Sequence, residues 1–167
     1  MSVDEDPLGT VTRTGDAYEL RFERRIAQPL EKVWAALTVP ERLADWLTAA
    51  ELDLRVGGVF RLRFDEPQAY AFEGRIVELD PPRLIAWTWP HEQHPDSVVR
   101  WELFPDGDGC RLVMTQSRMF APHLVEVAGG WHTLLEGLPA AADGVRTIWR
   151  AEHEAEIAKL YAGLPGD

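Results

Sequence analysis

The sequence predicts an α+β fold, in which a curved antiparallel sheet of six to seven strands is covered by one long helix near the C-terminus. Consecutive segments between residues 10 and 116 alternate apolar and charged residues, as strands with one buried face do. Apolar residues then recur at helical spacing over residues 122–138. Because the apolar face of a sheet needs a cover, we expect this helix to lie on it.

The alternation is clearest in residues 18–26, where Leu20, Phe22 and Ile26 share one face and Arg24 interrupts it. Turn residues such as Asp80-Pro81-Pro82 separate the segments, so the strands are expected to form a meander. Further strands are predicted at 59–64, 70–79, 84–89, 98–104 and 110–116, and residues 10–13 and 51–54 are two short candidate strands.

Two short helices are expected after the first long strand. Leu30, Val33 and Leu37 fall on one helical face, and Pro29 suits the first turn of that helix. Thr38 stands three residues before Glu41, which fits a capping box at the start of the second helix.

The long helix is expected to end at Pro139 and Asp143-Gly144. A further helix over residues 145–161 follows, with a stripe of small residues that would allow it to dock closely on the domain or on a second chain. Docking on the domain is favoured. The chain therefore divides into a flexible N-terminus (1–8), the sheet–helix domain (9–142) and a docked C-terminal helix (143–167).

Composition excludes several classes of partner. The 167 residues carry a formal net charge of −11, which argues against nucleic acids and anionic membrane surfaces. The single cysteine, Cys110, permits no internal disulfide, and its place on an apolar strand face indicates a structural thiol. Neither a signal peptide nor an apolar run of membrane-spanning length is present, so a cytoplasmic protein is expected.

Short motifs between Gly9 and Leu138 resemble one family. They are Val33-Trp34, Pro40-Glu41, Trp46-Leu47, Val56-Gly57-Gly58 and Gly130-Trp131. In this order they are similar to the SRPBCC (START-like) superfamily, in the branch named for activators of the ninety-kilodalton heat-shock chaperone's ATPase. The resemblance implies a single-domain, helix-grip member of that branch. The same fold serves ligand carriers, cyclases, hydrolases and co-chaperone modules, so it implies no one function.

Apolar and aromatic side chains converge on the space between the predicted sheet and the long helix. Such residues either line a ligand cavity or fill the core. The candidate cavity-lining residues are Trp34, Trp46, Phe60, Leu62, Phe72, Ile85, Trp87, Trp89, Trp101, Met114, Trp131 and Leu135.

Few polar residues are candidates for chemistry in that space. His132 lies next to Trp131 and would sit either at the cavity edge or half-exposed. Arg24 interrupts the apolar face of its strand. Glu78 shares the parity of Phe72 and Ile76, which would point it toward the cavity mouth, although a strand end where the alternation has already frayed is favoured. The segment from His91 to His94 lacks the spacing of a zincin motif, since its histidines are three apart rather than four. We therefore expect no catalytic set, no metal and no cofactor.

Three functions compete. The first is binding of a hydrophobic or aromatic small molecule in the sheet–helix cavity, by a monomer or homodimer that is no evident enzyme. The second is an enzyme of the polyketide cyclase or hydratase kind, in which the shape of the cavity holds a folded substrate and a few polar groups transfer protons. The third, implied by the branch name and its link to the stress response, is a chaperone-ATPase activator. Known activators carry a separate N-terminal domain, for which this chain has no room.

Overall fold

The protein was analysed as a computed structural model that describes residues 6–64, 70–90, 95–120, 124–148 and 150–164. Its eight strands form one antiparallel sheet in the order β1-β2-β8-β7-β6-β5-β4-β3. The elements are β1 (Thr10–Thr14), β2 (Ala17–Ile26), α1 (Leu30–Thr38), α2 (Pro40–Trp46), β3 (Ala49–Leu52), β4 (Val59–Phe64), β5 (Tyr70–Asp80), β6 (Leu84–Thr88), β7 (Val98–Asp106), β8 (Gly109–Met119), α3 (Leu124–Ala142) and α4 (Ala151–Lys159).

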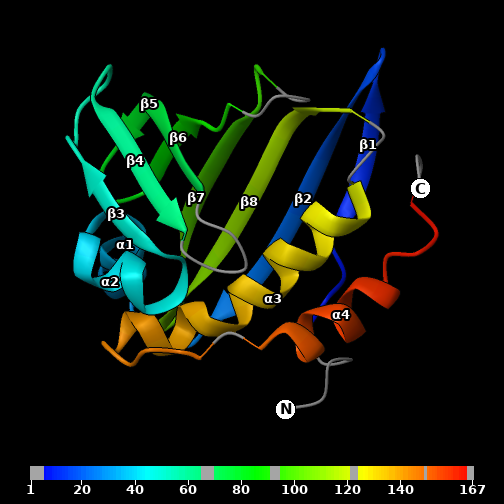
Figure 1. Ribbon diagram of the computed structural model, residues 1–167. Helices are drawn as coiled ribbons and strands as arrows, with labels where there is room; N and C mark the ends of the chain where they lie inside the picture. Colours follow the sequence, from blue (N-terminus) through cyan, green and yellow to red (C-terminus); the bar gives the residue numbers. More distant parts are fainter. Residues whose placement is uncertain (1–5, 65–69, 91–94, 121–123, 149, 165–167) are drawn as a thin grey trace.

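The sheet curves around α3, which crosses its inner face (Figure 1). Helices α1 and α2 lie beside β3 and contact α3, and α4 packs against α3 from the other side. The buried residues of all these elements form one core. No helix in the described ranges has the length and apolar character that crossing a membrane requires.

The predicted helix-grip fold is confirmed, with a sheet of eight strands rather than six to seven. Both short segments join it as edges: β1 pairs with β2, and β3 pairs with β4. The burial of Val99, Trp101 and Leu103 on β7 follows the predicted alternation. The tight turn between β7 and β8 is also as predicted, with Gly107 at φ 59°.

Two predictions about helix ends are wrong. Thr38 does not cap α2: its hydroxyl donates to the carbonyl of Trp34, four residues back in α1, and Val39 takes the N-cap position without a side-chain bond. Pro139 does not end α3, which continues through it to Ala142. The chain leaves the helix at Gly144, whose φ of 77° is favoured by the absence of a Cβ.

The last helix is shorter than predicted, because residues 145–148 precede it without helical structure. The small residues act as expected only in part. Ala158 lies so close to α3 that a Cβ on Gly129 would come within 3.1 Å of it, whereas Ile148 is 82% exposed. The three-part division of the chain stays a prediction, and most of its N-terminal segment falls outside the described residues.

A β-bulge in β5 sets which side chains face inward. The register against β6 shifts between Ile76, opposite Trp87, and Glu78, opposite Ala86. Just before this shift, Gly74 packs against the backbone of Thr88, where a Cβ would overlap the Thr88 carbonyl oxygen. The close approach of β5 and β6 therefore requires glycine at position 74.

Gly74→Ala is expected to lower the free energy of unfolding by about 1–3 kcal/mol, because the added methyl must push two paired strands apart. The matched control is Gly163→Ala, where a Cβ would meet no atom within 4 Å. Urea unfolding of both variants measures the difference. Equal stability of the two variants would contradict the requirement for glycine at position 74.

Candidate functional site

Aromatic rings form a continuous layer between the sheet and α3. Trp87 stacks on Phe60 with ring centroids 3.9 Å apart, and Trp89 stacks on Phe72 at 4.5 Å. The indole of Trp131, projecting from α3, meets Trp89 and Trp101 edge-on at 5.3 and 5.6 Å. These contacts are at ordinary packing distance, so the rings touch one another across the space predicted for a ligand.

Ten of the twelve candidate cavity residues are buried, and Trp34 and Trp89 are half-buried and pack against the core. Their role in lining a ligand cavity stays a prediction. Trp46 packs edge-on against Trp101 at 5.7 Å, and its indole N–H donates to the carbonyl of Ala36 at 2.7 Å. The rings fill much of the interior in the structure as described, and whether they part to admit a ligand stays a prediction.

Two indole N–H groups in this layer are buried and have no hydrogen-bond partner among the residues that the structure describes. They belong to Trp87 and Trp101, both 0% exposed. Burying a donor without a partner costs about 1–3 kcal/mol, and native proteins rarely leave such groups unpaired. These two donors are therefore the chemical feature of the layer that is open to a ligand acceptor.

A buried polar chain that sequence reasoning missed borders the same layer. The Trp131 indole donates to the side-chain oxygen of Gln116 at 2.7 Å, and the Gln116 amide nitrogen donates to Ser97 at 2.8 Å. The Ser97 hydroxyl faces the sulfur of Met119 at 3.6 Å. Gln116 has the same strand parity as buried Met114, and this signal could have placed it inside.

A second polar cluster lies on the inner face beside β2. Arg24 is 6% exposed and His132 is fully buried, so both predicted polar candidates point inward. The Nδ1 atom of His132 lies 2.7 Å from the Tyr161 hydroxyl, which also accepts a hydrogen bond from the Gly9 N–H at 2.8 Å. The cluster joins β2, α3 and both ends of the described chain.

Electrostatics in this cluster favour the neutral imidazole. Burial, and next the positive charge of Arg24, lower the pKa of His132 from its usual 6.5. Burial also lowers the pKa of Arg24, although Asp6, Tyr161 and Glu136 oppose that shift. The Arg24 Nη1 atom donates to the carbonyl of Glu23, while its Nε and Nη2 atoms have no hydrogen-bond partner within the described part of the chain.

Of the two alternatives for Glu78, the one that points it toward the cavity mouth is contradicted by the structure. The bulge in β5 reverses its face, so that Leu79 lies opposite inward-facing Ile85 and Glu78 turns to the outer side. There its carboxylate accepts from Arg100 at 3.0 Å. Glu78 belongs to an exposed ion pair rather than to the interior.

Acidic groups complete the cluster around His132. Asp6, His132 and Glu136 each offer one ligand atom, and these atoms all lie within 4.8 Å of one another. The other charge contact of Glu136 is with His153, whose Nε2 lies 2.7 Å from Oε1 of Glu136. Of the described residues, these three form the arrangement best suited to hold a metal ion.

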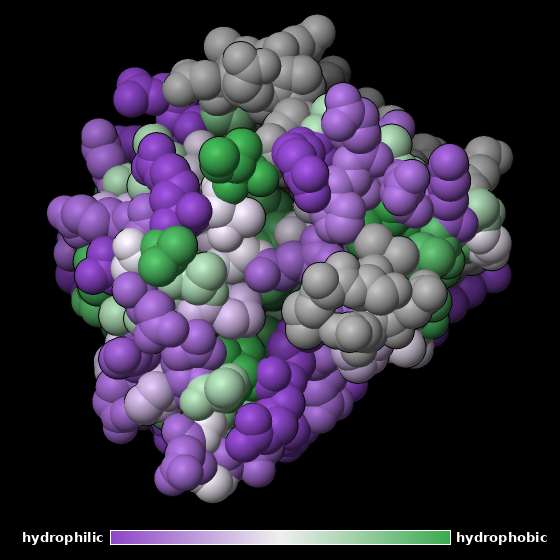
Figure 2. All heavy atoms as spheres, turned by 90° about the horizontal axis from the view of Figure 1, so that it is seen from below, coloured by the Kyte–Doolittle hydropathy of each residue, from purple (hydrophilic) through white to green (hydrophobic). Residues whose placement is uncertain are grey.

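A pocket of about 370 Å³ leads to this cluster from the surface. Asp6, Arg24, Glu136 and His153 line it, together with residues of the segment between α3 and α4. Seen from below, the surface of this end is mainly hydrophilic (Figure 2). The segment from His91 to His94, for which the sequence predicts no metal site, lies outside the described residues.

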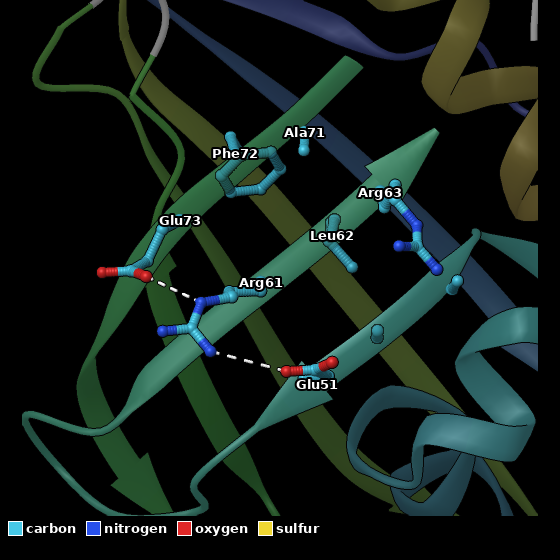
Figure 3. A pocket seen from close by; sticks show the side chains of 9 residues that line it. Glu51, Arg61, Leu62, Arg63, Ala71, Phe72 and Glu73 are labelled. Atoms are coloured by element: carbon cyan, nitrogen blue, oxygen red, sulfur yellow. Dashed lines mark hydrogen bonds and ion pairs between the residues drawn. The ribbon is translucent and has the colours of Figure 1, made fainter. Parts of the chain in front are cut away.

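A larger depression, of about 530 Å³, lies on the outer face of β3, β4 and β5. Its walls are charged: Arg61 bonds Glu73 at 2.7 Å and Glu51 at 3.4 Å across it (Figure 3). The Arg61–Glu73 pair matches the cross-strand contact expected from the register. The buried side chains of Leu62 and Phe72 also border the depression, and Phe72 belongs to the aromatic layer as well. The charges of Arg61, Glu73 and Glu51 pair with one another.

Comparison with known proteins identifies the architecture. The family model described as Activator of Hsp90 ATPase homolog 1-like protein matches residues 27–143. Among solved structures, CalU16 from Micromonospora echinospora is 30% identical, with 94% of each chain covered and a TM-score of 0.73. BPP1335 from Bordetella parapertussis is 27% identical, covering 95% of this chain and 91% of the other, with a TM-score of 0.72.

Another solved structure shares the fold alone. The Aha1 dimer from Colwellia psychrerythraea is 17% identical, with 74% of this chain and 95% of the other covered and a TM-score of 0.64. A search of the curated proteins found no match. The comparisons therefore support the fold and the family, and the chemistry has to be argued from the residues.

Lowering the pH from 7.5 to 5.5 is expected to destabilise the protein in part through His132. Because the pKa of His132 is lowered in the folded state, the unfolded chain takes up a proton near pH 6.5 that the folded chain resists. This contribution to stability is fully present above about pH 6.5 and is lost as the pH falls below it.

His132→Gln, which cannot be protonated, should lose less stability over the same pH interval than the unchanged protein. Urea unfolding at both pH values measures this. The same loss in both proteins would mean that His132 carries none of the pH dependence. An NMR titration of the His132 ring gives an independent check, with a midpoint below 6.5 expected.

Proposed function

We propose, since the chain belongs to the family of Activator of Hsp90 ATPase homolog 1-like proteins, that it binds a hydrophobic, aromatic small molecule between the sheet and α3. The observation that carries the proposal is the pair of unpartnered indole N–H groups of Trp87 and Trp101 within the aromatic layer. A ligand carbonyl or hydroxyl would satisfy them. No acid–base pair of described residues stands beside these donors, so binding is favoured over catalysis.

The layer suits a flat aromatic ligand better than a flexible chain. Its rings meet both face to face, as in Phe60 and Trp87, and edge to face, as in Trp101 and Trp131. An inserted ring would replace such contacts with similar ones, each worth about 0.5–1.5 kcal/mol beyond the area that it buries. The half-buried ring of Trp89, at the end of β6, offers a way in.

An enzyme of the cyclase or hydratase kind is the second candidate, because Arg24 and His132 are buried on the inner face of the same fold. A neutral buried imidazole is suited to accept a proton. The third reading, activation of a chaperone ATPase, rests on the family description alone. Neither candidate accounts for the unpartnered donors of Trp87 and Trp101.

Native mass spectrometry of the protein, purified gently from its own source cells, tests whether the interior carries a ligand. The expected result is a discrete extra mass that is lost on denaturation. Binding of the aromatic probe 8-anilinonaphthalene-1-sulfonate then measures affinity in the purified chain. An absent extra mass, together with no saturable binding of this probe, would contradict the proposal.

Trp101→Phe is expected to weaken binding of the same probe about five- to tenfold, because it removes one hydrogen-bond donor worth about 1 kcal/mol while keeping a ring in place. Phe104→Leu is the matched control: Phe104 lies on the outer face of β7, with the Arg111 guanidinium over its ring, and its loss should leave affinity unchanged. Equal effects of the two substitutions would show that the indole donor of Trp101 plays no part in binding.

A further inference from the structure

We propose that Asp6, His132 and Glu136 form a binding site for a divalent first-row transition-metal ion, with Zn²⁺ as the ion that tests it. Their ligand atoms lie within 4.8 Å of one another, and Asp6 and Glu136 also line the pocket beside β2. The site is separate from the aromatic layer, so it stands whether or not a small molecule binds there.

The imidazole of His132 carries the strongest observation. It is fully buried, its Nε2 atom has no hydrogen-bond partner among the described residues, and water has no access to that atom. A buried polar atom without a partner is costly, so Nε2 needs one. The neutral form of the ring supplies a lone pair to an ion.

The other ring nitrogen is held in a way that favours metal binding. Histidines that bind metals usually donate their second N–H to an oxygen, which fixes the tautomer and the ring orientation. Nδ1 of His132 lies 2.7 Å from the Tyr161 hydroxyl oxygen, and that oxygen also receives the Gly9 N–H. A proton on Nδ1 leaves the Nε2 lone pair free to bind an ion.

The carboxylates come from one helix position and one distant segment. Glu136 follows His132 by four residues on α3, so both side chains lie on the same helical face. One Glu136 oxygen is held by His153 at 2.7 Å, which leaves the other for the ion. Asp6 approaches from the N-terminal side, and this long separation in sequence is why the pattern of residues alone predicts no metal here.

The three ligand atoms are close enough for one ion to bind them all after small shifts. Bonds from Zn²⁺ to nitrogen and oxygen are about 2.0–2.2 Å long. Ligand atoms around one tetrahedral ion lie about 3.5 Å apart, so side-chain shifts of about 1 Å would complete the bonds.

The positive charge of Arg24 favours an anionic fourth ligand on the metal ion. The Arg24 guanidinium, 6% exposed, acts electrostatically on Asp6, Glu136 and His132. Its Nε and Nη2 atoms have no hydrogen-bond partner among the described residues. Two carboxylates against one guanidinium and a divalent ion leave one positive charge in excess. An anionic fourth ligand, such as hydroxide or chloride, would balance it and accept hydrogen bonds from Arg24.

The donor set selects among ions. One imidazole nitrogen with two carboxylate oxygens suits Zn²⁺ and its neighbours, whereas Mg²⁺ and Ca²⁺ prefer six or more oxygen ligands. We therefore expect Zn²⁺ to bind and Mg²⁺ to bind at least a hundredfold more weakly.

Equilibrium dialysis of the chelator-treated protein against Zn²⁺ and against Mg²⁺ at pH 7.5 tests the site. One Zn²⁺ per chain is expected, with affinity reduced at least tenfold by Asp6→Asn and by Glu136→Gln. Glu156→Gln, an exposed carboxylate on α4, is the matched control and should leave affinity unchanged. Circular dichroism of each variant checks that it folds.

Absence of bound Zn²⁺ would overturn the proposal, as would equal affinity in the unchanged protein and both test variants. A second measurement avoids substitution altogether. Zn²⁺ should shift the NMR signals of the His132 ring, with the largest change at Nε2. Shifts confined to the other four histidines would place the ion elsewhere and overturn the site.

Discussion

The whole structure depends on burying the inner face of the sheet under α3. Large rings on β4, β6 and β7 expose too much apolar surface to be left in water, and Trp131 on α3 closes over them. The single hydrogen bond from Trp131 to Gln116 fixes where along β8 the helix sits. Every inward-facing group is therefore positioned relative to one helix, and both clusters described above share it as a wall.

The inner face is divided along its width into two environments. Toward β4–β7 it is aromatic, and its unpaired polar groups are the indole donors of Trp87 and Trp101. Toward β2 it holds charged groups, with Arg24 facing the buried imidazole of His132. By excluding water, α3 makes the aromatic part of the inner face suitable for an apolar molecule. The same exclusion of water strengthens the electrostatic interactions between the charged groups near β2.

Sequence reasoning found the fold because strand alternation and helix spacing are local signals. It found the aromatic residues for the same reason, and the structure places Trp87 and Trp101 inside as predicted. It failed where the outcome depended on contacts between distant segments. The bulge that turns Glu78 outward arises from the pairing of β5 with β6, and the residues near Glu78 in the sequence do not predict it.

The surroundings of His132 also depend on contacts between residues that are distant in the sequence. His132 and Glu136 stand four residues apart on one helix, which was visible in the sequence, but their surroundings were not. Asp6 is drawn in from a segment expected to be flexible, and Tyr161 from a helix whose docking was expected only from small residues. Long-range placement of this kind is set by tertiary packing, which local patterns do not encode.

The hydroxyl of Tyr161 has a wider consequence than its two bonds. It binds His132 on α3 and the Gly9 backbone at once, so the segment before β1 and the segment after α4 share one anchor. Losing order in either segment removes a partner from the other, and the two behave as one cooperative unit rather than as independent tails. Asp6 belongs to the first of these segments and Tyr161 to the second. A change of conformation in either segment therefore alters the surroundings of the buried His132 side chain.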